Sequence, residues 1–188
     1  MIPGLVDIHF HGCVRHDMCD GTEESIQALA DYEAANGVLA ICPATMTIPE
    51  DQLMQAMKAA KEHKNGKGAD LVGINMEGPF VNKEKKGAQK EEDIKTADVD
   101  FFHRMQEAAG GLVKLIDLAP ETEGAMEFID QVKMKFMYQS HTQLQIMIQQ
   151  PKRFIEVSII LLIYTMQCRH LVTGHQELLE QQGTANVS

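Results

Sequence analysis

The chain has 188 residues, 44% of them hydrophobic and 23% charged, which is the composition of a folded globular protein. Its formal net charge of -10 and its lack of a basic patch argue against a nucleic-acid partner. The four cysteines show no CxxC pair and no regular spacing, which argues against a disulfide scaffold and favours a reducing, cytoplasmic location (Cys13, Cys19, Cys42 and Cys168).

Apolar runs in the first 133 residues predict four strands, over residues 5–11, 38–44, 71–76 and 113–118. A helical pattern follows each run: from Thr22, from Pro49, through 101–105 and over 123–132. Thr22 can cap the first helix, and Glu23 and Glu24 then lie at the positive end of the helix dipole. Strands that alternate with helices predict parallel βα units, in either a (βα)8 barrel or a doubly wound sheet.

Two histidines, His9 and His11, lie two residues apart on the first predicted strand. Side chains at this spacing share one face of a strand, and in a (βα)8 barrel that face is the interior, near the end where active sites form. Two imidazoles there can bind one divalent metal ion. Two structural histidines would give the same HxH pattern, so the pair alone leaves both interpretations open.

Glu77 ends the third predicted strand and is followed by Gly78 and Pro79. The Gly-Pro pair predicts a turn, which would aim the carboxylate at the mouth of the sheet. A solvent-facing loop glutamate is the alternative interpretation. His9 and His11 are expected at a comparable strand end, which favours the interpretation that the Glu77 carboxylate points inward.

Several segments resemble a known enzyme family. Residues 3–12 (PGLVDIHFHG) resemble the first barrel strand of the amidohydrolase superfamily. Residues 76–82 (MEGPFVN) and 85–89 (KKGAQ) resemble the signature of the N-acetylglucosamine-6-phosphate deacetylase family, and 118–121 (LAPE) fit its fourth-strand region. The resemblance covers roughly residues 2–133. It implies an α/β fold, a partial (βα)8 TIM-type barrel of about four βα units, with an irregular C-terminal tail.

The resemblance implies a metal-dependent hydrolase that removes acetate from N-acetyl-D-glucosamine 6-phosphate, a phosphorylated amino sugar. It also implies that Glu77, His9 and His11 are metal ligands and that Ala88 and Gln89 contact the substrate. The cofactor would be a divalent metal ion, with zinc or iron favoured, that polarises the acetamide carbonyl and lowers the pKa of water. Members of this family often form homo-oligomers. No catalytic residue is assigned, because the family's catalytic aspartate comes from a later strand that has no match here.

Two more histidine ligands of the family, in a GHT-like motif and in THxxNAM, also have no match in this chain. His141 and Thr142 stand in a context unlike a barrel strand. The chain is therefore expected to be inactive as written. Two alternatives remain: another amidohydrolase, of the dihydroorotase type, which the EGPF and KKGAQ segments disfavour, and a non-catalytic α/β remnant.

Residues 134–188 differ in composition from the rest. They hold nine of the chain's 15 glutamines, only three of its 27 acidic residues, and a single alanine against 16 before them. Their most apolar stretch, 154–166, contains Glu156 and is too short to cross a bilayer, so no membrane partner is expected. A second domain or an irregular tail is the simplest interpretation of this change.

The genetic code offers another explanation. Joining the third base of each codon to the first two of the next permits the translation SIAHTTADYDTA from residues 138–150 and THLYNAM from 161–168. Both missing histidine motifs of the family therefore reappear, in order, in one alternate frame. We expect that the reading frame changes near Lys133, so that 1–133 form the partial amidohydrolase barrel and 134–188 an out-of-frame tail.

Overall fold

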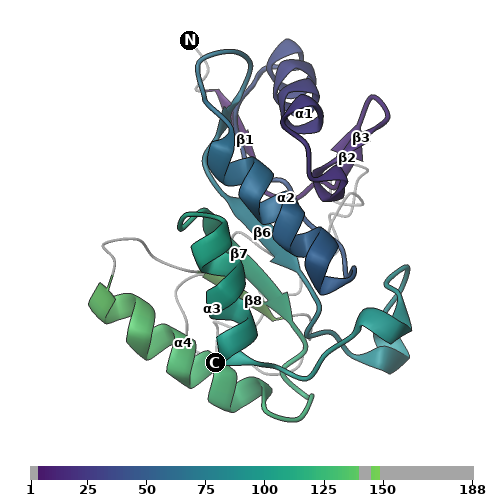
Figure 1. Ribbon diagram of the computed structural model, residues 1–188, viewed down its shortest axis with the longest axis vertical. Coiled ribbons are helices and arrows are strands. Elements are labelled where there is room, and N and C mark those ends of the chain that lie inside the picture. The colour runs from purple at the N-terminus through teal and green to yellow at the C-terminus, as the bar shows by residue number, and fades with distance from the viewer. Residues whose placement is uncertain (1–3, 140–144, 149–188) are drawn as a thin grey trace, which may run out of the picture. The chain divides into compact units, whose positions relative to one another are not determined.

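Within each of the two parallel sheets of this α/β protein, the strands lie beside one another in chain order (Figure 1). The computed structural model describes the backbone of residues 4–139 and 145–148, and the side chains of residues 4–132. One parallel sheet has the order β1 (Leu5–Asp7), β4 (Val38–Ile41), β5 (Asp70–Leu71). The other has the order β6 (Ile74–Glu77), β7 (Val113–Leu118), β8 (Gln145–Ile148), also parallel. A short antiparallel hairpin, β2 (Gly12–Cys13) and β3 (His16–Asp17), follows β1.

The two parallel sheets are joined by backbone contacts just after β4. Ala44 forms a parallel bridge with Asn75 in β6, and the amide of Thr45 donates to the carbonyl of Asn75 at 2.9 Å. Asn75 in turn donates its backbone amide to the carbonyl of Pro43 at 3.0 Å. The strands of consecutive βα units are thus neighbours, and their carboxyl ends lie at the same edge.

Helices connect the parallel strands. α1 (Glu23–Ala35) follows the hairpin, α2 (Glu50–Glu62) follows β4, α3 (Val99–Ala108) follows β6, and α4 (Ala125–Gln139) follows β7. Single-turn 3-10 helices lie at η1 (Met18–Asp20), η2 (Lys83–Lys85) and η3 (Glu91–Asp93). Figure 1 shows α2 and α3 lying across the strands, where they contact each other. None of the helices in the described residues is long and apolar enough to cross a membrane.

Local signals explain where the helices begin. The side chain of Thr22 accepts from the backbone amide of Ser25, so Thr22 caps α1 as predicted. Pro49 precedes the first residue of α2, and Asp98 caps α3 by accepting from the amides of Asp100 and Phe101. Each helix turns an apolar stripe toward the sheet, with buried side chains such as Leu29 in α1 and Met57 in α2.

The predicted strands are longer than the observed ones. The strand expected over 5–11 ends at Asp7, and that expected over 38–44 ends at Ile41. The strand expected over 71–76 is two short strands, β5 and β6, separated by Val72 and Gly73. The strand over 113–118 is confirmed. A strand ends where its backbone stops pairing regularly with the neighbouring strand. A run of apolar residues does not reveal that point.

The end of the described chain also differs from the expected irregular tail. Helix α4 runs through the expected boundary at 133 to Gln139, and β8 at 145–148 pairs with β7. Of the two segments whose alternate frame carries the histidine motifs, 161–168 lies outside the described residues, as do 140–144 and 149–150 of 138–150. The alternation of parallel strands and helices confirms the α/β class, whereas the assignment to a partial (βα)8 barrel of about four βα units stays a prediction.

Candidate metal centre

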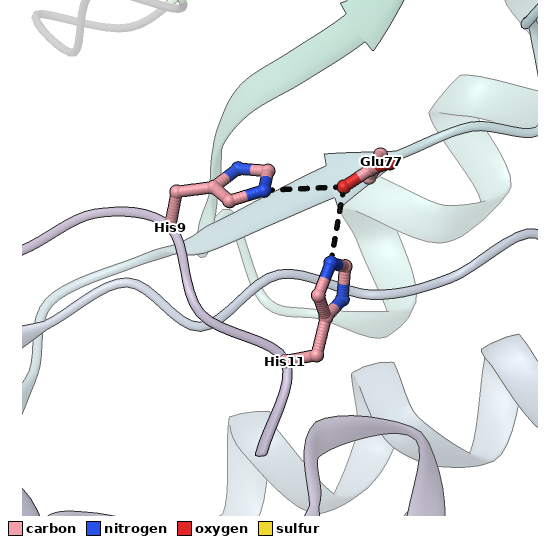
Figure 2. A group of neighbouring side chains, drawn as sticks. All are labelled: His9, His11 and Glu77. Atoms are coloured by element: carbon pink, nitrogen blue, oxygen red, sulfur yellow. Dashed lines mark ion pairs between the residues drawn. The ribbon is translucent and has the colours of Figure 1, made fainter. Parts of the chain in front are cut away.

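Three side chains converge at the carboxyl ends of β1 and β6. His9 Nε2 and His11 Nε2 each lie 3.2 Å from the same oxygen, Oε2 of Glu77 (Figure 2). The two imidazole rings meet edge to face, with centroids 5.4 Å apart. We call His9, Glu77 and His11 the His–Glu–His cluster. Its three ligand atoms lie within 4.8 Å of one another, which is the spacing needed to contact a single ion.

The histidines are held by backbone hydrogen bonds between the end of β1 and the segment that follows β4. The carbonyl of Asp7 accepts from the amide of Cys42, and the carbonyl of Phe10 accepts from the amide of Ala44, both at 2.7 Å. The Asp7 side chain also accepts from the His9 amide at 3.0 Å. The prediction that strand alternation orients His9 and His11 was therefore wrong in detail, because neither residue is in a strand. The prediction that they point to one place is confirmed.

Glu77 is positioned by the turn that ends β6. Gly78 has φ of +79°, a left-handed conformation that glycine adopts without cost. A side-chain carbon added at Gly78 would overlap Thr47 Oγ1, so the close packing of the turn also requires a residue without a side chain. The strand end and the segment after β4 are thus packed directly against each other, and the carboxylate is left facing the histidines.

Two buried polar residues, missed by the sequence analysis, surround His9. The Asn75 side chain is fully buried; its Nδ2 lies 2.9 Å from His9 Nδ1 and donates to the carbonyl of Ile8 at 3.2 Å. Asp117, at the end of β7, is 2% exposed, and its Oδ2 lies 3.9 Å from His9 Nδ1. Asp117 could have been found, because it stands at a predicted strand end like Glu77. Asn75 gave no such signal.

Charge in the cluster is set by its own members. Burial opposes ionisation of Glu77, but hydrogen bonds and charge from His11 and His9 outweigh it and lower the pKa of Glu77 to about 2. The hydrogen bond to Glu77 raises the pKa of His11 and that of His9, again against burial. Burial raises the pKa of Asp117 to about 7. The site therefore holds a firmly ionised carboxylate between two basic imidazoles.

The donor set suits a borderline divalent cation. Imidazole nitrogen and carboxylate oxygen are the ligands that zinc and iron accept, with zinc bonds of about 2.0–2.2 Å. The two histidines contact Glu77 directly, and an ion held by these three side chains would replace those contacts with ligand bonds. His11 Nδ1 is buried and has no hydrogen-bond partner among the described residues. If His11 Nε2 binds an ion, the imidazole proton lies on Nδ1. The residues present fit such an ion.

Cysteine ligands do not join this set. Cys19 Sγ accepts from the amide of Met46 at 3.2 Å, and burial raises the pKa of its thiol to about 12. Burial likewise raises the pKa of the Cys13 thiol. Thiolate, not thiol, is the metal ligand, so both cysteines favour the protonated form at neutral pH. His141, the other histidine considered from the sequence, lies outside the described residues.

The two residues expected to contact substrate lie on the loop after β6. Ala88 is exposed, whereas Gln89 is 5% exposed. The Gln89 side chain donates to Glu77 Oε1 at 2.9 Å and accepts from the amide of Thr47 at 2.6 Å. Their substrate contacts stay a prediction, but the loop that carries them reaches the His–Glu–His cluster.

The metal-free protein should show the cluster in its pH dependence. The raised pKa of His11 stabilises the fold fully below pH 6.5, the ordinary value, and this contribution is lost as pH rises through the raised pKa. The lowered pKa of Glu77 stabilises the fold above pH 4.5, and that contribution is lost as pH falls toward about 2. Both are present together between pH 4.5 and 6.5.

Urea unfolding of the metal-free wild type and of Glu77→Gln, at a series of pH values, measures this dependence. We expect the stability difference between them to be largest between pH 4.5 and 6.5 and to shrink on both sides. In the same variant, the His11 pKa measured by NMR should fall. A difference that does not vary with pH would show that the three side chains do not interact.

Known proteins similar to this chain are deacetylases of phosphorylated amino sugars. No protein-family profile matches the chain. The N-acetylglucosamine-6-phosphate deacetylase of Bacillus subtilis is 35% identical over 138 residues, which cover 71% of this chain and 35% of that protein. An N-acetylgalactosamine-6-phosphate deacetylase of Escherichia coli O157:H7 is 28% identical over 137 residues, covering 72% of this chain and 36% of its own length.

Solved structures give the same result. The Mycobacterium smegmatis N-acetyl-D-glucosamine-6-phosphate deacetylase D267A mutant, in complex with N-acetyl-D-glucosamine-6-phosphate, superposes with a TM-score of 0.64 at 25% identity. The match covers 69% of this chain and 34% of that one. The Thermotoga maritima N-acetylglucosamine-6-phosphate deacetylase shares the fold, with a TM-score of 0.59. The chain spans about a third of the length of the relatives it matches. Over about 70% of its own residues, it is a homologue of the N-acetylglucosamine-6-phosphate deacetylases.

Proposed function

We propose that this chain carries part of the metal-binding site of a deacetylase that removes acetate from N-acetyl-D-glucosamine 6-phosphate. The observation that carries the proposal is the convergence of His9 and His11 on one oxygen of Glu77, at 3.2 Å each. The relatives named for a phosphorylated N-acetyl amino sugar supply the substrate class. They include both the glucosamine and the galactosamine forms, and the higher identity to the Bacillus subtilis enzyme favours the former.

The proposed cofactor is zinc or iron, held by His9, His11 and Glu77. Such an ion, when bound, would polarise the acetamide carbonyl and acidify water. The protonation states of the three side chains determine when such an ion can bind. Glu77 remains ionised at all pH values at which the enzyme would work, because its pKa is about 2. The two imidazoles bind through Nε2 once their protons are lost, so metal affinity should rise with pH through their raised pKa values.

We further propose that the loop at 85–89, with Ala88 and Gln89, contacts the sugar. This loop carries the KKGAQ segment, lies next to Glu77 and is exposed at Ala88. Its lysines, Lys85 and Lys86, place positive charge near a site that would receive a sugar phosphate. The proposal includes assembly as a homo-oligomer, by analogy with the family.

The polypeptide as written is proposed to be inactive, because residues 134–188 are an out-of-frame translation. The support is the change of composition at about residue 133 and the two histidine motifs in one alternate frame. Sequencing the coding DNA across codon 133 tests this directly. One uninterrupted frame through Ser188, confirmed on independent clones, would refute the frame change.

The function is tested by restoring the frame near codon 133 and extending the coding sequence downstream. The repaired protein should release acetate from N-acetylglucosamine 6-phosphate in a metal-dependent manner, whereas the chain as written should not. The repaired protein should also leave dihydroorotate intact. Hydrolysis of dihydroorotate instead of the sugar would support the dihydroorotase alternative, and deacetylation by the chain as written would disprove its inactivity.

A further inference from the structure

Both the oxygen and the nitrogen of the Gln89 side-chain amide contact groups around the His–Glu–His cluster. The carbonyl oxygen accepts from the backbone amide of Thr47 at 2.6 Å. The amide nitrogen donates to Glu77 Oε1 at 2.9 Å and lies 3.6 Å from the sulfur of Met46. A primary amide offers two hydrogens and one oxygen, so each of these groups has at least one partner here. At 5% exposure, the side chain is enclosed by the groups that it bonds.

The two oxygens of Glu77 have different partners because of the hydrogen bond from Gln89. Oε1 is taken by Gln89, and Oε2 is the atom that both histidines contact, at 3.2 Å. Without that bond, the carboxylate could rotate about its last side-chain torsion, which has a broad energy minimum. With it, Oε1 is fixed to the protein. Oε2 is then the oxygen that both histidines contact (Figure 2).

Gln89 also links Glu77 to a second element of the fold. Thr47 follows β4, while Glu77 ends β6, and Gln89 comes from the loop between η2 and η3. Three separate segments are therefore joined through one amide. Fixing a carboxylate in this way matches the known role of outer hydrogen-bonding partners, which orient metal ligands and raise their affinity.

We propose that Gln89 is a positioning residue for Glu77, which holds Oε1 so that Oε2 is available as the metal ligand. This role is separate from the substrate contact predicted for residues 88–89. The inference rests on the proposed function, because it requires that the His–Glu–His cluster bind a metal. It predicts a loss of metal affinity even when no substrate is present.

The test is zinc affinity, measured by competition with a chelating dye, for the wild type, Gln89→Met and Asn82→Ala. Methionine has nearly the same length as glutamine but cannot donate to Glu77 or accept from Thr47. Asn82 is the matched control, since its side chain anchors the same loop. It donates to Glu121 at 2.9 Å and accepts from the Glu84 amide at 2.8 Å, so these hydrogen bonds go to groups other than Glu77 and Thr47. Affinity is compared at a temperature where circular dichroism shows each metal-free variant to be folded.

We expect Gln89→Met to bind zinc about 10- to 100-fold more weakly than the wild type, and Asn82→Ala to bind it equally well. If Gln89→Met does not fold, Gln89→Asn, whose shorter amide cannot span from Thr47 to Glu77, replaces it with the same expectation. Unchanged affinity would overturn the proposal. Equal losses in the glutamine and Asn82 variants would also overturn it, since they would show a general effect of the loop. A wild type that binds no zinc would instead refute the proposed metal function.

Discussion

Replacing Glu77 with alanine is expected to lower zinc affinity more than the roughly 10- to 100-fold typical for loss of an outer hydrogen-bonding partner. The reason is that Glu77 supplies the ligand oxygen that both histidines face, at 3.2 Å each. Removing it also takes away the negative charge that would offset the positive charge of the ion. Equilibrium dialysis against zinc at pH 7.5–8 measures the effect.

Glu62→Ala is the control for this prediction, because Glu62 is exposed at the end of α2 and outside the cluster. It changes the net charge by the same amount as Glu77→Ala. Glu77→Gln serves as a second variant that keeps the shape of the side chain and weakens only its ligand character. If both Glu77 variants bind zinc as tightly as Glu62→Ala does, the cluster is not the metal site.

The second large effect is expected in the core beside the site. Phe80 is fully buried and forms edge-to-face contacts with Phe101 and Phe128, at centroid distances of 5.8 and 5.1 Å. Phe80→Ala should lower the free energy of unfolding by about 3–5 kcal/mol, because it removes a large apolar side chain and leaves a cavity between two helices and the sheet. Loss of the two ring contacts is included in that range.

Urea denaturation measures this change, with Leu39→Ala as the matched control. Leu39 is in β4 but is 63% exposed, so its truncation should change stability by no more than about 0.5 kcal/mol. Because Phe80 follows the Glu77 turn by three residues, the variant should also weaken zinc binding when it remains folded. A loss below about 1 kcal/mol for Phe80→Ala would show that this aromatic core is not packed as described.

Residue patterns predicted the elements of the fold well but not their ends. Thr22 and Pro49 marked the starts of α1 and α2 correctly, because helix capping depends on local side-chain chemistry. The first strand was expected to reach His11 but ends at Asp7, since pairing depends on where the neighbouring chain runs. That information is non-local, and a run of apolar residues does not contain it.

The candidate site was predicted in part. His9, His11 and Glu77 were named together because a strand end and an HxH pair give a visible signal, and the structure brings them together. Asn75 and Asp117 were missed, although both are buried beside His9. Asp117 stands at a predicted strand end and could have been named, whereas the role of Asn75 depends on which segments are neighbours, which a single sequence does not show.

The hydrogen bonds of Gln89 could not be predicted from the motif. The family pattern marked Gln89 as a residue that contacts substrate, which stays a prediction, and gave no sign that its side chain is bonded to Glu77 and Thr47. Only the distances reveal those two bonds. A motif indicates that a residue belongs to a site, and the hydrogen-bond inventory indicates what it does there.

X-ray absorption spectroscopy of the zinc-loaded chain tests the central claim, that His9, His11 and Glu77 hold a divalent ion, most directly. We expect a first shell of nitrogen and oxygen at about 2.0–2.2 Å, with the outer-ring scattering of two imidazoles and no sulfur. In His9→Ala and His11→Ala, one imidazole should be lost from each spectrum. A sulfur shell at about 2.3 Å, or a spectrum that is unchanged in both histidine variants, would contradict the account.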